Sequence, residues 1–390
     1  MSHSGTSSRR SSHSTSGNSN VDSAIDISEE FFLGGLFSEK AADLEATRIE
    51  KIKLPNVFSS ITAPAARLNP LLYSDVPREA DEWAREVLKL TDEAYARHRK
   101  AQFSLLAAGF VPDADAYGFR IMCDFMEWVF YFDDLFDEGN LRENPAAARD
   151  EVEAHLNIHN HGRPDISPSE HPVRHMYQVV WRKIQAIASL GAQERYVQGM
   201  RHYFEGCIVQ VDSYYWHTRG YVSTTFDMFW RGRTHSVGCR PCQALLEPLY
   251  NIDLPEEVWS HPMIKEAEDT ATVITFLHND IFSYRKEQAE PEAVPHNTIF
   301  ILQRERKLSL QESFDFAGEL LKQAVQRWYW TQQHLPSFGE HADIQVQRYL
   351  DGLLDQAKAN LHWSFASGRY FGKDSEEARR DMTLDIIVRN

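Results

Sequence analysis

Apolar side chains recur at helical spacing from Pro77 almost to the C-terminus, and this periodicity limits the chain to a helical fold. Runs in which apolar and polar residues alternate are few, and no convincing hairpin turn signal joins them. We therefore predict a single all-α domain built as a helical bundle. Its helices are expected at 81–99, 115–137, 145–156, 171–190, 193–217, 223–235, 238–250, 256–261, 263–288, 295–305, 309–333 and 340–369.

The two ends of the chain differ from this helical region. Residues 1–25 are rich in serine and have no apolar block, so we expect a disordered leader rather than a secretory signal. Residues 26–77 are acidic and contain prolines, which predicts a short helix at 40–51 and an extended strap towards residue 77. The functional domain is then expected at 78–375, followed by a C-terminal tail at 376–390.

Composition argues against several classes of protein. Asp and Glu outnumber Lys and Arg by 57 to 41, so the formal charge of −16 disfavours nucleic acid as a partner. No apolar run is long enough to span a membrane, and we expect a cytoplasmic protein. The four cysteines are too few for a disulfide scaffold, and the single CxxC at 239–242 has no second pair with which to hold zinc.

The segment 279–287 carries the most specific chemical signal. Asn279, Ser283 and Glu287 are spaced at i, i+4 and i+8, so a helix places them on one face. An amide oxygen, a hydroxyl and a carboxylate form an oxygen-only ligand set, which suits Mg²⁺. The alternative is an exposed helix with no ligand, but a polar triad that follows an apolar helix is unlikely by chance.

A second acidic group ends the expected helix at 115–137. Asp133, Asp134 and Asp137, with Glu138 beside them, end a strongly apolar helix that carries Met126, Trp128, Val129, Phe130, Tyr131 and Phe132. Such carboxylates either form a solvated helix end or a metal site at the mouth of a buried cavity. They also oppose the helix dipole, a cost that favours a compensating role. Two polar helix faces on one chain together suggest a diphosphate held by a magnesium cluster.

With these motifs the chain resembles class I terpene synthases, specifically fungal, basidiomycete-like sesquiterpene synthases. Residues 133–137 match the family's aspartate-rich motif, and Asn279, Asp280, Ser283 and Glu287 match its NDxxSxxxE motif.

Two further features support the resemblance. Arg233 lies 46 positions before Asn279, where the family has its diphosphate-sensing arginine, and Pro241 after it fits the fungal pattern. The pair Arg369 and Tyr370 matches the family's C-terminal signature. Bacterial relatives place an acidic residue and glycine after the sensor, whereas this chain has Ser236 and Val237.

The resemblance implies a helical bundle around a deep apolar cavity, with three Mg²⁺ at its mouth. The metal ligands would be drawn from Asp133, Asp134, Asp137, Asn279, Ser283 and Glu287. The diphosphate would be bound by Arg233, Lys286, Arg369 and Tyr370.

Aromatic side chains would line the cavity below the metals. Phe130 lies three residues before Asp133 and Phe276 three before Asn279, so both are expected to face the cavity and to stabilise a carbocation. Trp363 is a third candidate. For each of these rings, ordinary core packing remains the alternative.

The function that follows is Mg²⁺-dependent cyclisation of farnesyl diphosphate to a sesquiterpene, with release of diphosphate, by a monomer or homodimer. A chain-elongating prenyltransferase would need a second Asp-rich motif where this chain has the Asn/Ser/Glu motif. Geranyl or geranylgeranyl diphosphate as substrate stays open, as does a homologue that binds prenyl diphosphate without turnover. No side chain stands out as a terminal base.

Overall fold

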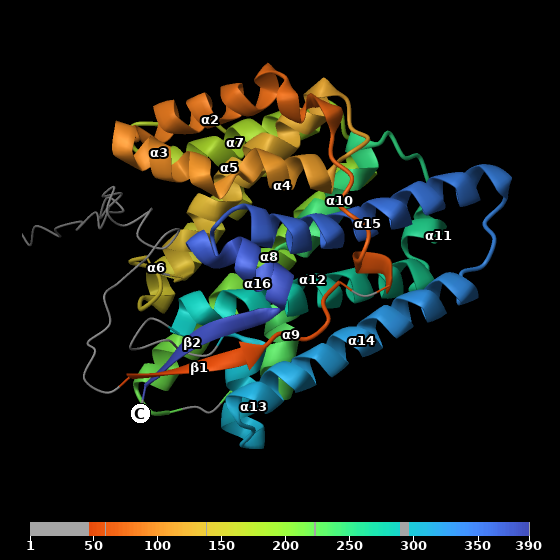
Figure 1. Cartoon of the computed structure of the whole chain (residues 1–390). Coiled ribbons are helices and arrows are strands. Elements are labelled where there is room, and N and C mark those ends of the chain that lie inside the picture. The colour runs from red at the N-terminus through yellow and green to blue at the C-terminus, as the bar shows by residue number, and fades with distance from the viewer. Residues whose placement is uncertain (1–46, 59, 138, 222–223, 289–295, 390) are drawn as a thin grey trace, which may run out of the picture.

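The computed structural model describes residues 47–58, 60–137, 139–221, 224–288 and 296–389. This part of the chain is mostly helical, so the prediction of an all-α fold is confirmed (Figure 1). The expected leader at 1–25, the segment 26–46 and Glu138 lie outside the described residues.

The α-helices are α2 (Asp75–Leu88), α3 (Asp92–Ala101), α4 (Phe103–Phe110), α5 (Ala116–Asp137), α6 (Pro145–Ile158), α7 (Pro172–Gln185), α8 (Leu190–Thr218), α9 (Phe226–Ser236), α10 (Cys239–Leu249), α11 (Glu256–Trp259), α12 (Pro262–Gln288), α13 (Thr298–Arg306), α14 (Leu310–His334), α15 (Glu340–Ala366) and α16 (Ser375–Asp381). The remaining elements are the 3₁₀ turns η2 (Ser60–Thr62), η3 (Pro70–Tyr73) and η4 (Gly372–Asp374) and the strands β1 (Thr47–Lys53) and β2 (Thr383–Arg389).

Helices α5 and α12 are the two central helices of the bundle. Helix α5 packs against α4, α2 and α7, and α12 packs against α14 and α15. Helix α8 contacts α5, α9 and α10, and α9 and α10 also contact α12, so this set of helices connects α5 with α12. The Asp115 carboxylate accepts a hydrogen bond from Gly118 N (2.8 Å) at the start of α5 and so satisfies one free donor of its first turn.

Both central helices are buried on most sides. This burial distinguishes a solvated helix end from a site at a cavity, the two alternatives for their polar residues. In α5 the rings of Phe119, Phe125 and Phe132 are fully buried, and buried residues continue to Phe136 at the end of the helix. In α12 the buried set includes Ser283. Of the motif residues, Asp134 and Asp280 are buried, and Asp133, Asp137, Asn279 and Glu287 are partly buried, so these side chains do not form fully solvated helix ends.

The long helix expected at 81–99 is two helices. Lys89 adopts a left-handed conformation (φ 53°) that ends α2, and Thr91 caps α3 through a hydrogen bond from Ala94 N. Helix α4 was not expected, because its sequence is apolar on nearly every side and has no helical periodicity.

A two-stranded antiparallel ribbon joins the N- and C-terminal segments. Strand β1 pairs with β2 in a register that aligns Ile52 with Leu384. The helix expected at 40–51 is therefore wrong for residues 47–51, and residues 40–46 lie outside the described part. The strands are more than 300 residues apart, so no turn signal could mark the pairing.

The expected domain boundaries fall within elements of the structure. Residue 78 lies in α2, and the extended strap before it contains η3. The expected tail at 376–390 includes most of α16 and strand β2. In the described ranges, no helix is both long and apolar enough to cross a bilayer.

Candidate active site

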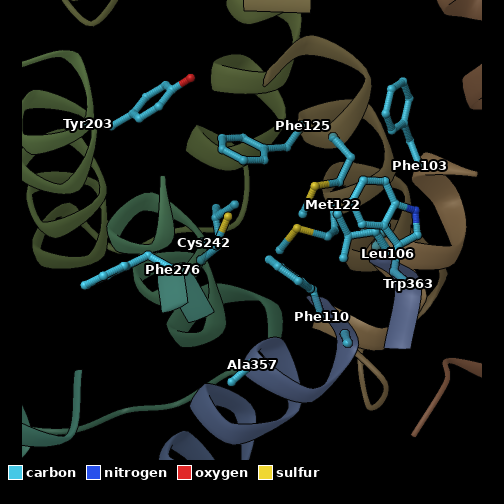
Figure 2. Close-up of a cluster of buried hydrophobic side chains, with 14 of the residues drawn as sticks. Phe103, Leu106, Phe110, Met122, Phe125, Tyr203, Cys242, Phe276, Ala357 and Trp363 are labelled. Carbon is cyan, nitrogen blue, oxygen red and sulfur yellow. The ribbon is translucent and has the colours of Figure 1, made fainter. Parts of the chain in front are cut away.

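A cavity of about 230 Å³ lies between α5, α8, α12 and α15. Its apolar part is formed by side chains of α4, α5 and α10, among them Leu106, Phe110, Phe125, Met126, Val129 and Cys242. Figure 2 shows several of these side chains gathered in one buried cluster. Its polar part collects side chains from both motifs, namely Asp133, Asp137, Arg233, Asn279, Ser283, Lys286, Glu287, Arg369 and Tyr370. The structure therefore brings together residues that are more than 200 positions apart.

Helix α5 directs two of its three aspartates into the cavity. Asp133 and Asp137 are four residues apart and share the cavity face, together with Phe130. Asp134 is rotated by about 100° from Asp133 and does not line the cavity. It is buried instead beside Arg369, with 3.9 Å between Asp134 Oδ1 and Arg369 Nη2. The prediction of Asp134 as a metal ligand is therefore corrected: its position suits orienting Arg369.

Helix α12 places Asn279, Ser283 and Glu287 on the opposite wall of the cavity. The intervening Asp280 does not face the cavity. Its Oδ1 accepts a hydrogen bond from Arg233 Nε (2.8 Å), and its Oδ2 accepts two from the backbone N and the hydroxyl of Thr298 (2.8 and 2.6 Å). The aspartate of this motif thus connects α9, α12 and α13.

Three residues that sequence reasoning missed hold the candidate metal ligands. Tyr203 of α8 donates its hydroxyl hydrogen to Asp133 Oδ1 (2.9 Å), and Gln210 of the same helix donates to Asp137. These two residues are seven positions apart, a spacing that could have marked one polar helix face.

Asn297 is the third of these residues, and it binds the opposite motif. Its amide nitrogen donates to Glu287 Oε2 (2.9 Å) and Ser283 Oγ (3.3 Å), and also to the backbone oxygen of Asp280 (2.8 Å). The only signal in the sequence is its position directly before the apolar start of α13.

Arg233 and Asn279 are hydrogen-bonded to each other. Arg233 Nη2 donates to Asn279 Oδ1 (2.6 Å), and Asn279 Nδ2 donates to the Tyr370 hydroxyl (2.9 Å). Arg233 Nη1 also lies 3.4 Å from Ser236 Oγ, which is 2.8 Å from His296 Nε2. The sensor position, the second metal motif and the C-terminal signature are therefore one connected network.

The expected aromatic residues divide into two groups. Phe130 and Trp363 line the cavity, and the Arg369 guanidinium lies over the Phe130 ring at 5.0 Å. Phe276 does not line it: its ring packs against Trp230, with centroids 4.9 Å apart, and Figure 2 shows it directed away from Phe110 and Phe125. The expectation for Phe276 is therefore wrong. Thr275, four residues before Asn279, has the cavity-facing position instead, because four residues make nearly a whole turn.

Burial raises the pKa of carboxylates on both walls. The Asp133 pKa rises to about 6, because burial and then the nearby Asp134 disfavour its charge. The Glu287 pKa rises to about 7 through burial and the charge of Asp280. A divalent cation would reverse both effects, so the oxygen donors and crowded carboxylates fit Mg²⁺. The thiols of Cys239 and Cys242 are buried with raised pKa values, so neither is an activated nucleophile.

The chain is similar to known proteins in sequence and in fold. Residues 124–327 match the family described as terpene synthase family 2, C-terminal metal binding. The chain is 35% identical to the silphinene synthase peniA of Penicillium patulum, over 90% of this chain and 94% of that protein. It is 32% identical to the sesquiterpene synthase 1 of Postia placenta, over 87% and 96%. Among solved structures, the germacradien-4-ol synthase of Streptomyces citricolor superposes with a TM-score of 0.65 at 21% identity, over 77% and 96%, and so shows the same fold.

Proposed function

Because this chain belongs to the terpene synthase family, we propose that it is a Mg²⁺-dependent sesquiterpene cyclase, which ionises and cyclises farnesyl diphosphate and releases diphosphate. The observation that supports the proposal is a cavity whose mouth combines the polar faces of α5 and α12 and whose floor is mostly apolar. The polar mouth suits a diphosphate with its metal ions, and the apolar floor suits a hydrocarbon chain. Two relatives, at 35% and 32% identity, are named a silphinene synthase and a sesquiterpene synthase, and the second name supports a C15 substrate.

We assign the metal ligands to the two facing helices. Asp133 and Asp137 would hold two Mg²⁺, and Asn279, Ser283 and Glu287 would hold the third. Bound Mg²⁺ would act as a Lewis acid on the diphosphate and neutralise the charge of the leaving group. Tyr203, Gln210 and Asn297 would fix the orientation of these ligands, because each donates a hydrogen bond to at least one of them.

The diphosphate-binding residues surround the same mouth. Arg233, Lys286, Arg369 and Tyr370 line the cavity beside the candidate metal ligands. Their donors would stabilise the negative charge that develops on the departing oxygens when the carbon–oxygen bond breaks. Arg233 now donates to the Asn279 oxygen that a metal would need. Substrate binding would therefore move the Arg233 guanidinium from Asn279 to a phosphate oxygen.

The lower cavity would hold the carbocation. Phe130 and Trp363 offer aromatic faces that attract a cation and supply no nucleophile. Most of the other floor residues are apolar and would exclude water from the reactive chain. The expected cytoplasmic location, the monomeric or homodimeric state and the number of metal ions stay predictions.

The test is incubation of the purified protein with Mg²⁺ and, in separate reactions, geranyl, farnesyl and geranylgeranyl diphosphate, followed by gas chromatography–mass spectrometry. We expect a cyclic C15 product from farnesyl diphosphate that disappears with EDTA and in Asp133→Ala. A cyclic product from a different substrate alone would contradict the C15 assignment. Binding of all three without a product would show a homologue that does not turn them over.

A further inference from the structure

A second group of candidate metal ligands lies behind the cavity wall, outside the active site. It consists of Asp81 on α2, His98 on α3 and Glu127 on α5, whose ligand atoms all lie within 4.8 Å of one another. The side chains of His98 and Glu127 are 1% and 0% exposed, whereas Asp81 is 21% exposed. One imidazole and two carboxylates from three different helices therefore meet at a buried point with one partly open side.

The contacts within this group are close but do not have the geometry of hydrogen bonds. His98 Nε2 lies 3.1 Å from Glu127 Oε2 and 3.8 Å from Asp81 Oδ1. Apart from the ion-pair contact between His98 and Glu127, neither His98 Nε2 nor either oxygen of Glu127 makes a well-aligned hydrogen bond, although all three atoms are buried. Buried polar atoms without an aligned hydrogen bond are rare, because the loss of hydration is then only partly offset.

A shared metal ion accounts for this geometry. Zinc binds nitrogen and oxygen ligands at about 2.0–2.2 Å, so two ligands of one ion lie roughly 3–3.5 Å apart. Each ligand then points at the ion and not at the other ligand. A 3.1 Å contact without a hydrogen-bond angle between Nε2 and Oε2 is the result expected for two ligands of one cation.

The other nitrogen of the imidazole is also arranged as in metal sites. His98 Nδ1 lies 2.9 Å from the Tyr131 hydroxyl, and the two rings are stacked with centroids 5.8 Å apart. A partner on one ring nitrogen orients a histidine so that the second nitrogen faces a metal. Tyr131 therefore fixes the ring with Nε2 directed towards the two carboxylates.

We propose that Asp81, His98 and Glu127 bind one first-row divalent cation of the zinc type. A nitrogen ligand disfavours Mg²⁺, which prefers oxygen, and distinguishes this site from the one at the cavity mouth. A doubly charged ion balances the two carboxylates, with neutral His98 as the third ligand. The partly exposed side at Asp81 gives the ion a path of entry and room for water as a fourth ligand. The ion would join α2 and α3 to α5, the helix that carries Asp133, as a structural site.

The test measures bound zinc in the complete protein. The purified chain is equilibrated with ZnSO₄ in the presence of excess MgCl₂, freed of unbound metal and analysed by inductively coupled plasma mass spectrometry. We expect about one zinc ion per chain, as for a single three-ligand site. Glu127→Gln and Asp81→Asn are expected to reduce the zinc content at least about 10-fold at limiting ZnSO₄, since each removes a ligand.

Two control variants separate this site from others. Asp124→Asn changes another buried carboxylate of α5, whose partners are Arg120 and Lys183, and should retain the zinc. Asp133→Ala should also retain it, because Asp133 belongs to the cavity. Since Asp81 is partly exposed, Asp81→Asn tests the site even if Glu127→Gln does not fold.

Two further measurements use the wild-type protein. After removal of metal with EDTA, ZnSO₄ should raise the thermal midpoint by about 4 °C at 100-fold saturation, and MgCl₂ should not. X-ray absorption at the zinc edge should show an imidazole among nitrogen and oxygen ligands. Less than about 0.1 zinc per chain, or equal zinc in Asp81→Asn, would overturn the proposal. The group would then be a buried ion pair of protonated His98 with Glu127.

Discussion

Arg233 is the residue whose contacts say most about how catalysis begins. It is almost fully buried, and its guanidinium binds Asp280 and Asn279 at the same time. A flexible ammonium cannot make this pair of contacts, because the fork of arginine presents its donors in a fixed plane. The residue that would sense the diphosphate thus also holds a metal ligand before substrate arrives, which links metal binding to movement of Arg233.

The aromatic residues give a prediction at the same scale. Phe130→Leu should change the ratio of products, because Phe130 lines the cavity below Arg369. Phe276→Leu should leave the ratio unchanged and lower the thermal midpoint, because its ring fills a space beside Trp230. The cost expected for such a core change is about 1–2 kcal/mol. Both variants are tested by product analysis with farnesyl diphosphate and by thermal melting. An altered product ratio in Phe276→Leu would contradict its assignment to the core.

The errors at single residues have one physical origin. Asp134 and Phe276 were assigned to the cavity from their nearness in sequence to Asp133 and Asn279. On a helix each residue turns by about 100°, so Asp134 points well away from the face of Asp133, and a residue at i−3 lies about 60° off the face of residue i. That offset leaves Phe130 in the cavity, whereas Phe276 packs against Trp230. Motif spacing therefore identified Asp137, Ser283 and Glu287 as cavity-facing, but nearness alone did not identify the residues beside them.

At the scale of elements, the start of α13 has two functions. Asn297 caps this helix, since its side-chain oxygen accepts from Ile299 N (2.8 Å). Its amide nitrogen donates to Glu287 and Ser283 of α12. The first function stabilises α13, and the second orients two candidate metal ligands.

A substitution can separate these two functions. Asn297→Ser keeps a capping hydroxyl but loses the amide donors, so the Mg²⁺ concentration for half-maximal activity should rise about 10- to 100-fold. The control is Asn144→Ser, which alters the cap of α6, where Asn144 accepts from Ala147 N. Activity titrated with Mg²⁺, combined with circular dichroism, tests both variants. If the two show the same Mg²⁺ dependence, Asn297 acts only as a cap.

The ribbon β1–β2 and helix α4 show why elements were missed. Ile52 and Leu384 are buried where the ribbon meets the helices, but their strands are separated by almost the whole chain. Local patterns carry no information on such a pairing. The cavity-facing helices, in contrast, were predicted because long periodic segments carry their own signal.

For the molecule as a whole, a partly buried histidine, His159, sets part of the acid limit of stability. Burial and then the charge of Arg201 lower the pKa of His159 from 6.5 to about 4, and the Tyr177 hydroxyl lies 2.7 Å from its Nε2. The unfolded chain binds a proton below pH 6.5 that the folded imidazole does not bind until about pH 4. Stability should therefore fall as the pH drops from 6.5 to 4.

Replacement of this histidine tests the effect. In His159→Gln the free energy of unfolding should depend less on pH, by up to about 1.4 kcal/mol per pH unit between 6.5 and 4. His161→Gln, at an exposed histidine nearby, should behave like the wild type. Urea unfolding at pH 7, 6 and 5 gives the dependence of the free energy of unfolding on pH for the wild type and for each of the two variants. An unchanged slope in His159→Gln would show that the folded imidazole is protonated as readily as the unfolded one.

The fold class and the two polar walls of the cavity could be predicted from the sequence, because both depend on helical spacing. The hydrogen-bond network around these two walls could not be predicted from the sequence. Tyr203, Gln210 and Asn297 come from α8 and from the segment before α13, and only tertiary packing brings them to Asp133, Asp137 and Glu287. The group of Asp81, His98 and Glu127 is equally invisible in sequence, since it joins three helices without a common motif.

The most direct measurement is a crystal structure of the protein with Mn²⁺ and diphosphate, in which anomalous scattering locates the metal ions. We expect three ions at the cavity mouth, two bound by Asp133 and Asp137 and one by Asn279, Ser283 and Glu287, with Arg233 moved from Asn279 to a phosphate oxygen. Diphosphate bound without metal at these residues, or metal ions bound away from α5 and α12, would contradict the proposed mechanism.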